Sequence, residues 1–282
     1  MSILDGLNPQ QRAAVTHSGT PLLVIAGAGS GKTRVLTRRI AYLLAELDVA
    51  PYEVLAITFT NKAANEMKER VIELVGNRAK SMWVSTFHSA CVRILRSDAV
   101  ALGYSNSFTI YDAADSLRLV TLVMKDMNLD PKRYNSRAIA GLISDAKNEL
   151  MGPADFAQTV KNQFDEIVAE VFTHYQKRLS SANALDFDDL ISETVELLQR
   201  HPEIRAKYRS RFKHILVDEY QDTNHAQYIL IRELVGSSFD GFPMAELCVV
   251  GDSDQSIYAF RGANIRNILQ FEDDFPEATT VL

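Results

Sequence analysis

Cysteine is scarce in this sequence of 282 residues: Cys91 and Cys248 stand far apart, each inside an apolar run. Such a pair excludes a disulfide framework and a cysteine-based metal site, and it predicts two buried thiols in a reducing, cytoplasmic compartment. Apolar runs are also short. The strongly apolar stretch at residues 21–28 cannot cross a bilayer, which takes about 20 residues. The first six residues hold no basic or long apolar segment, so we expect no secretory signal and no membrane association.

Repeats and low-complexity linkers are absent as well. Apolar residues make up 46% of the chain and charged residues 23%, which is ordinary for a globular protein and excludes a disordered or fibrous one. At roughly 100–200 residues per domain, the length predicts two domains.

Positive charge is in deficit, with a net charge of −6. As a total this argues weakly against nucleic-acid binding, but the charge is uneven. The net charge is +4 over residues 1–106, −1 over 107–184 and −9 over 185–282. The acidic excess therefore lies in the last third, and the first third is mildly basic.

Short apolar runs, each bounded by turn residues, predict buried strands. Most are followed by polar or glycine-rich residues and then by a helical pattern, which is typical of a parallel α/β sheet flanked by helices. The predicted strands are residues 22–26, 54–58, 83–86, 215–217, 247–250 and, less clearly, 280–282.

The alternation stops between residues 107 and 184, where the pattern is helical throughout: 114–127, 137–149 and one long stretch at 155–180. We interpret 107–184 as an all-helical subdomain inserted between strands of one α/β domain, which comprises residues 1–106 and 185–282. After the insertion, Asp186 has the position of an N-cap and Asp189 that of a first-turn residue in a new helix.

A glycine-rich loop follows the first predicted strand directly. It fits the phosphate-loop pattern G-x-x-x-x-G-K-T except that alanine replaces the first glycine. Small residues let backbone N–H groups turn inward around phosphate oxygens, and the next helix points its N-terminus at the anion. A glycine-rich turn that binds nothing is the weaker alternative, given the strand before and the helix after. The loop consists of Ala26, Gly27, Ala28, Gly29, Ser30, Gly31, Lys32 and Thr33.

Within this loop Lys32 would place a cation near the β- and γ-phosphates of ATP, and the Thr33 hydroxyl can ligate Mg²⁺. Two carboxylates, Asp218 and Glu219, follow another buried strand. An aspartate at that strand end is suited to organise the metal, and Glu219 to deprotonate the attacking water. The combination predicts a nucleoside-triphosphate hydrolase. A third strand leads to Gln255 and Arg261, which could sense the γ-phosphate, although chemistry alone leaves both open.

Six ordered segments resemble those of the superfamily 1 DNA helicases of the UvrD/PcrA/Rep group, across essentially the whole chain. The segments are residues 7–11 (LNPQQ), 26–33 (AGAGSGKT), 58–64 (TFTNKAA), 85–88 (STFH), 217–223 (VDEYQDT) and 250–258 (VGDSDQSIY). The resemblance implies a RecA-like P-loop NTPase domain, ATP and Mg²⁺ as cofactors, and ATP-dependent 3′–5′ translocation on single-stranded DNA, with duplex junctions as substrates. It also implies partners in DNA repair or replication.

The resemblance further assigns residues. Gln11 would read the adenine edge, Arg34 would pack near the base, and Gln255 and Arg261 would couple the γ-phosphate to movement. Contacts to single-stranded DNA would come from Phe59, Asn61, His88, Tyr258 and Phe260. For Phe59 and its neighbour Phe87, core packing is the alternative, and for Phe87 it is the better one. Lys147 and Asn148 are further candidates for touching the DNA backbone.

Two departures qualify the resemblance. Phe260 stands where the family usually has tryptophan, which still allows base stacking. The sequence stops where the family continues into a second motor domain, so we expect this chain to hold half of an ATPase site and to hydrolyse ATP poorly alone. Two other functions remain open: a subunit of a helicase–nuclease complex, or a short nucleotide- or DNA-binding module without motor activity.

Overall fold

The computed structural model describes residues 2–27, 29–237, 243–252, 271 and 273–282. Ala28, Gln255, Tyr258, Phe260 and Arg261 lie outside this part. Two compact units form: residues 1–90, 202–224 and 231–282 make a sheet unit, and residues 91–201 and 225–230 make a helical unit. The predicted insertion spanned the narrower range 107–184.

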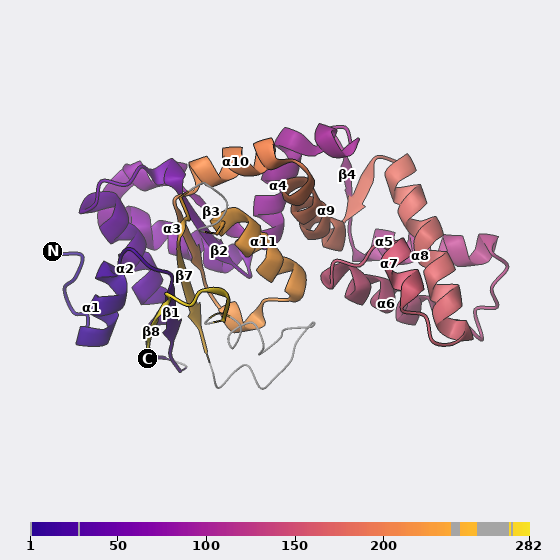
Figure 1. Ribbon diagram of the computed structural model, residues 1–282, viewed down its shortest axis with the longest axis horizontal. Helices are drawn as coiled ribbons and strands as arrows, with labels where there is room; N and C mark the ends of the chain where they lie inside the picture. The colour runs from indigo at the N-terminus through magenta and orange to yellow at the C-terminus, as the bar shows by residue number, and fades with distance from the viewer. Residues whose placement is uncertain (1, 28, 238–242, 253–270, 272) are drawn as a thin grey trace. The chain divides into compact units, whose positions relative to one another are not determined.

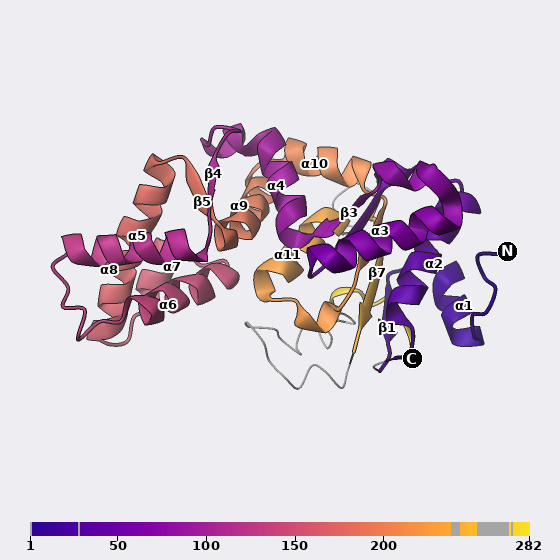
Figure 2. The same cartoon turned by 180° about the vertical axis from the view of Figure 1, so that it is seen from behind.

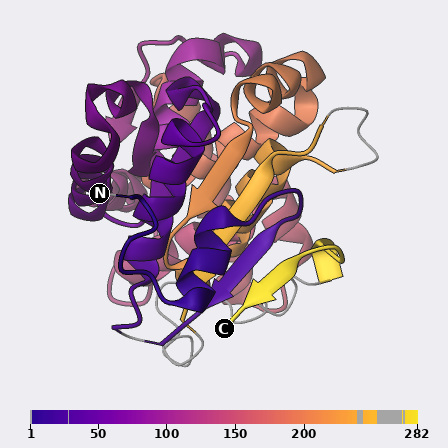
Figure 3. The same cartoon turned by 90° about the vertical axis from the view of Figure 1, so that its left-hand side faces the viewer.

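The sheet unit is built on six strands in the order β3-β2-β6-β7-β1-β8, and every neighbouring pair is parallel. Figure 3 shows β8 beside β1. This is the α/β parallel sheet that the alternating pattern predicts. The strands are β1 (Leu22–Ile25), β2 (Val54–Thr58), β3 (Trp83–Thr86), β6 (His214–Val217), β7 (Glu246–Gly251) and β8 (Thr279–Val281).

Both faces of the central strands are buried, because successive side chains point to opposite faces and all five residues of β2 are inaccessible. One face packs against the helices α1 (Pro9–Thr16), α2 (Lys32–Ala45) and α3 (Asn61–Val75). Figures 1 and 2 show α2 and α3 beside the sheet. The helix α10 (Pro202–Arg211) also belongs to the sheet unit. The helices α4 (Phe87–Asp98) and α11 (His225–Val235) belong to it in part, since each is divided between the two units.

The helical unit contains α5 (Ala113–Asp126), α6 (Ser136–Asn148), α7 (Pro153–Gln158), α8 (Gln163–Ser181) and α9 (Phe187–Arg200). A short parallel pair, β4 (Thr109–Tyr111) and β5 (Ala184–Asp186), accompanies them. The core of the helical unit contains apolar side chains from α5, α6 and α8, among them Val123, Ile143 and Phe172.

The prediction of a single long helix at residues 155–180 is wrong, because α7 ends at Gln158 and α8 begins at Gln163. The Asn162 side chain accepts hydrogen bonds from the backbone N–H groups of Phe164 and Asp165, which starts a new helix. The expected start of α9 is confirmed, since Asp186 is its N-cap and accepts from the N–H of Asp189.

Both cysteines are free and buried, as expected. Among the described residues, none of the helices has the length and apolar character needed to cross a bilayer.

Candidate nucleotide site

Three adjacent strands of the sheet, β6, β7 and β1, bring the candidate nucleotide-binding residues together. Because the strands are parallel, their carboxyl ends meet at one edge of the sheet. The phosphate loop follows β1, Asp218 and Glu219 follow β6, and Asp252 follows β7. Residues far apart in the sequence therefore form one polar site.

The loop backbone has the shape that its glycines predict. Gly29 and Gly31 have φ values of +76° and +89°, in the left-handed region that favours glycine. Gly31 is also the N-cap of α2, so the positive end of that helix begins at the loop. This places backbone N–H groups and a helix N-terminus where an anion can bind.

Lys32 is buried and fully engaged. Its ammonium group donates to the carbonyl of Ala26 at 2.9 Å, to that of Gly27 at 3.4 Å and to the Asp252 carboxylate at 2.8 Å. Asp252 is 0% exposed and Lys32 is 9% exposed, so this ion pair lies inside the protein. A phosphate group that reaches Lys32 has to replace Asp252 as its anionic partner.

Asp218 is a buried carboxylate beside the loop. Burial, followed by the negative charge of Glu219, raises its pKa to about 6, while Lys32 and a hydrogen bond with the Thr33 hydroxyl act in the opposite direction. An ionised carboxylate so poorly compensated, next to a hydroxyl oxygen, fits a divalent cation.

Among the described residues, no group of three or more His, Cys, Asp or Glu side chains could hold a metal ion by itself. Asp218 offers one buried carboxylate, and proteins commonly bind Mg²⁺ through one or two carboxylates together with substrate phosphates and water.

Glu219 sits on an unusual backbone. Its φ of +49° and ψ of +46° lie in the left-handed region, which is uncommon for a glutamate. Such conformations cluster at functional sites, where the surrounding structure holds them. The backbone N–H of Glu219 donates to the Asp218 carboxylate at 3.0 Å, which joins the two acidic residues.

Gln11 lies on α1 and reaches across to the phosphate loop. Its amide nitrogen donates to the carbonyl of Ser30 at 2.9 Å, and its amide oxygen accepts from the N–H of Asn8 at 3.1 Å. The capping box of α1 thus fixes the amide next to the loop. Arg34, on the first turn of α2, is exposed and lies beside Gly6.

Candidate DNA contacts follow the other two strands of the same edge, β2 and β3. Phe59 is half-buried and packs edge-to-face against Phe87, with ring centroids 5.6 Å apart. Phe87 is buried, as expected for a core residue. Asn61 is exposed at the start of α3, and His88 is half-buried on α4.

Five of the predicted site residues lie outside the described residues: Ala28, Gln255, Tyr258, Phe260 and Arg261. Conversely, sequence reasoning missed Asp252 and Gln221, which both enter the site. For Asp252 the signal was present, because it follows an apolar run just as Asp218 does.

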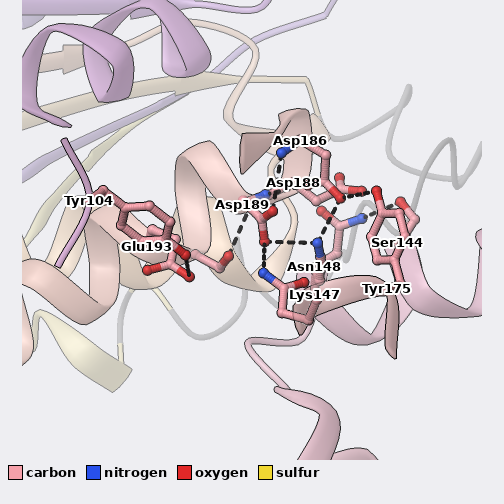
Figure 4. Close-up of polar contacts among 11 residues, drawn as sticks. Tyr104, Ser144, Lys147, Asn148, Tyr175, Asp186, Asp188, Asp189 and Glu193 are labelled. Carbon is pink, nitrogen blue, oxygen red and sulfur yellow. Dashed lines mark hydrogen bonds and ion pairs between the residues drawn. The ribbon is translucent and has the colours of Figure 1, made fainter. Parts of the chain in front are cut away.

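Lys147, considered above for the DNA backbone, is only 4% exposed and lies in a second polar cluster, inside the helical unit (Figure 4). It pairs with Asp186 at 2.6 Å and Asp189 at 2.8 Å, and the Tyr175 hydroxyl donates to Asp186 at 2.7 Å. Burial opposes the charge of Lys147, but the two carboxylates outweigh it and raise its pKa above the ordinary value. The interpretation of Lys147 as a DNA contact is therefore wrong for this conformation.

Comparison with known proteins gives one consistent result. The sequence profile of the UvrD/REP helicase N-terminal domain matches residues 7–276. The chain is 61% identical over 285 residues to the ATP-dependent DNA helicase UvrD1 of Mycobacterium bovis, covering 99% of this chain and 37% of that protein. It is 53% identical over 280 residues to the ATP-dependent DNA helicase PcrA of Bacillus subtilis, again covering 99% and 37%. The chain thus spans less than two-fifths of these relatives.

Proposed function

The chain belongs to the UvrD/REP helicase family, and we propose that it supplies the nucleotide-binding half of an ATP-dependent DNA helicase that moves 3′–5′ along single-stranded DNA. The observation that carries the proposal is the convergence of Lys32, Asp218 and Glu219 at one edge of the parallel sheet, after β1 and β6, the two strands on either side of β7. That arrangement suits hydrolysis of a nucleoside triphosphate.

In the proposed reaction Lys32 exchanges its contact with Asp252 for the β- and γ-phosphates and stabilises their charge. Thr33 and Asp218 would hold Mg²⁺, which would supply positive charge to neutralise the phosphates. Glu219 accepts the proton of the attacking water, the role of a general base. Gln11 recognises the adenine edge and Arg34 lies near the base. Gln255 and Arg261 are assigned to γ-phosphate sensing on their sequence positions alone.

Single-stranded DNA is the proposed second ligand. Phe59, Asn61 and His88 follow β2 and β3, beside the strands that carry the nucleotide residues, and Tyr258 and Phe260 are added from sequence. Aromatic faces stack on bases at about 1–3 kcal/mol each without regard to sequence, as a translocating motor requires. Duplex junctions, repair or replication partners and a cytoplasmic location belong to the same proposal.

Steady-state ATP hydrolysis tests the proposal, measured with and without single-stranded DNA on the protein expressed from the intact reading frame. We expect DNA to stimulate hydrolysis and Lys32→Ala to abolish it. Lys125→Ala, which removes an exposed lysine of α5, is the matched control and should keep the wild-type rate. Hydrolysis that persists in Lys32→Ala would refute the site, and hydrolysis indifferent to DNA would refute the motor.

A further inference from the structure

Gln221 occupies the turn after β6, two residues beyond the candidate general base, and is only 1% exposed. Its amide nitrogen donates to the Glu219 carboxylate at 2.8 Å. Its amide oxygen accepts from the backbone N–H of Asp252 at 2.9 Å. The exposed Asp222 carboxylate lies 3.5 Å from the same amide nitrogen, at the limit of a hydrogen bond. One buried side chain therefore spans the ends of β6 and β7.

The two hydrogen bonds fix the orientation of the amide. Its oxygen has to face the N–H of Asp252, because an NH₂ group there would oppose another donor. The nitrogen is then directed at Glu219, and a flipped amide would set its oxygen against a carboxylate oxygen. Burial makes either mismatch costly, since no water replaces the lost partners. The Glu219 carboxylate therefore accepts a hydrogen bond from an amide nitrogen whose orientation is fixed.

Asp252 connects the same amide to the phosphate loop, since its carboxylate pairs with Lys32 at 2.8 Å. The chain of contacts runs from the lysine of the loop through Asp252 and Gln221 to Glu219. A carboxylate that takes a proton from water has to point at that water, and small errors in such placement are expensive in rate.

We propose that Gln221 is a positioning residue for ATP hydrolysis: it orients the Glu219 carboxylate toward the attacking water and ties that carboxylate to the end of β7. The inference rests on the proposed function, because it assigns Gln221 to the same site. Gln221 itself contacts neither nucleotide nor water in this role. Its removal should therefore slow the chemical step and leave nucleotide binding nearly intact.

The test compares Gln221→Leu with wild type in the protein expressed from the intact reading frame, with ATP and saturating single-stranded DNA. We expect kcat to fall by about 10- to 100-fold, while KM for ATP changes by less than about threefold. Thr194→Val is the matched control. It deletes a different buried side-chain hydrogen bond, from the Thr194 hydroxyl to the carbonyl of Leu190 at 2.7 Å in the helical unit, and should leave kcat unchanged.

Gln221→Glu supplies a readout that a merely structural role would not move. The new side chain keeps an oxygen for the N–H of Asp252, but when ionised it repels Glu219. When protonated it can again donate to Glu219. We expect the kcat of this variant, relative to wild type, to rise as the pH is lowered from 8.5 to 6, whereas Gln221→Leu shows no such recovery.

Two results would overturn the inference: a Gln221→Leu variant whose kcat stays within twofold of wild type, or a Gln221→Glu variant whose loss of kcat is the same at every pH and follows its melting temperature. Failure of the proposed function looks different, because wild type would then show no hydrolysis that depends on Lys32.

Discussion

At the scale of single residues, two glycines of the phosphate loop share a backbone conformation but not their surroundings. Both have φ in the left-handed region. Among the described residues, a Cβ on Gly29 would meet no atom within 4 Å, whereas a Cβ on Gly31 would lie 3.1 Å from the amide nitrogen of Gln11. The pair separates the cost of backbone strain from the cost of displacing a neighbour.

We predict that Gly29→Ala lowers the free energy of unfolding by about 1–2 kcal/mol, the cost of a left-handed alanine. Gly31→Ala should cost more, because Gln11 has to move away from Ser30 as well. Denaturant unfolding of the nucleotide-free chain measures both. Equal losses for the two variants would contradict the close approach of Gln11.

At this scale the sequence predicts which residues come together when their positions at the ends of strands determine where they lie in the fold. The sequence predicts that Lys32, Asp218 and Glu219 lie close together because each follows a buried strand, and parallel strands end at one edge. Gln221 was not found, because its role depends on which atoms its amide meets across two strands. Lys147 was misjudged because a lysine is usually exposed, and only the fold places two carboxylates beside it.

At the scale of secondary-structure elements, the ion pair of Lys147 joins α6 to the start of α9. We predict that Lys147→Met lowers the free energy of unfolding by about 3–5 kcal/mol, because it leaves Asp186 and Asp189 buried without a counter-charge. Lys132→Met, which removes an exposed lysine of the helical unit, should change stability little. Denaturant unfolding and DNA affinity should be measured together. Weaker DNA binding at unchanged stability would restore the DNA-contact interpretation.

The helical unit also holds an acidic group whose titration affects stability. Burial, followed by the charges of Asp189 and Glu196, raises the pKa of Glu193 on α9 to about 8 from the ordinary 4.5. The Tyr104 hydroxyl donates to its carboxyl group at 3.4 Å. Because the folded state prefers the protonated form, stability from this group is fully present below pH 4.5 and is lost as the pH rises through 8.

Glu193→Gln should therefore raise the melting temperature by about 3–6 °C at pH 8.5 and leave it nearly unchanged at pH 4.5. The amide still accepts the bond from Tyr104 but never ionises. Glu170→Gln, on an exposed position of α8, is the control and should show no such pH dependence. A uniform shift at both pH values would refute the assignment.

Element boundaries followed from the sequence where local patterns decide them. The predicted strands at 54–58 and 83–86 coincide with β2 and β3, because each is a short apolar run between turn residues. The break between α7 and α8 was missed, since apolar periodicity continues through it and only the cap at Asn162 interrupts the helix. The strand order was not predictable, because it depends on pairings between distant segments.

At the scale of the whole molecule, the described residues of the candidate nucleotide site lie along one edge of a single sheet. Under the proposed function, further positive charge for hydrolysis comes from a second motor domain, and arginines in such positions are worth about 10³–10⁵ in rate. We predict that the 282-residue chain binds nucleotide weakly and hydrolyses ATP at least about 10³-fold more slowly than the protein from the intact reading frame. A DNA-stimulated rate equal to that of the longer protein would contradict this prediction.

The sheet order also governs when this protein can fold during synthesis. The phosphate-loop strand β1 emerges early, but its neighbours β7 and β8 lie more than 200 residues later, the last pairing joining Leu22 to Thr279. Loops of that length are slow to close. The helices of residues 91–201 contact one another over shorter separations in sequence, so they can form before β1 pairs with β7 and β8. A ribosome that pauses before β7 would therefore hold a chain with a folded helical unit and an exposed apolar strand, a natural target for chaperones.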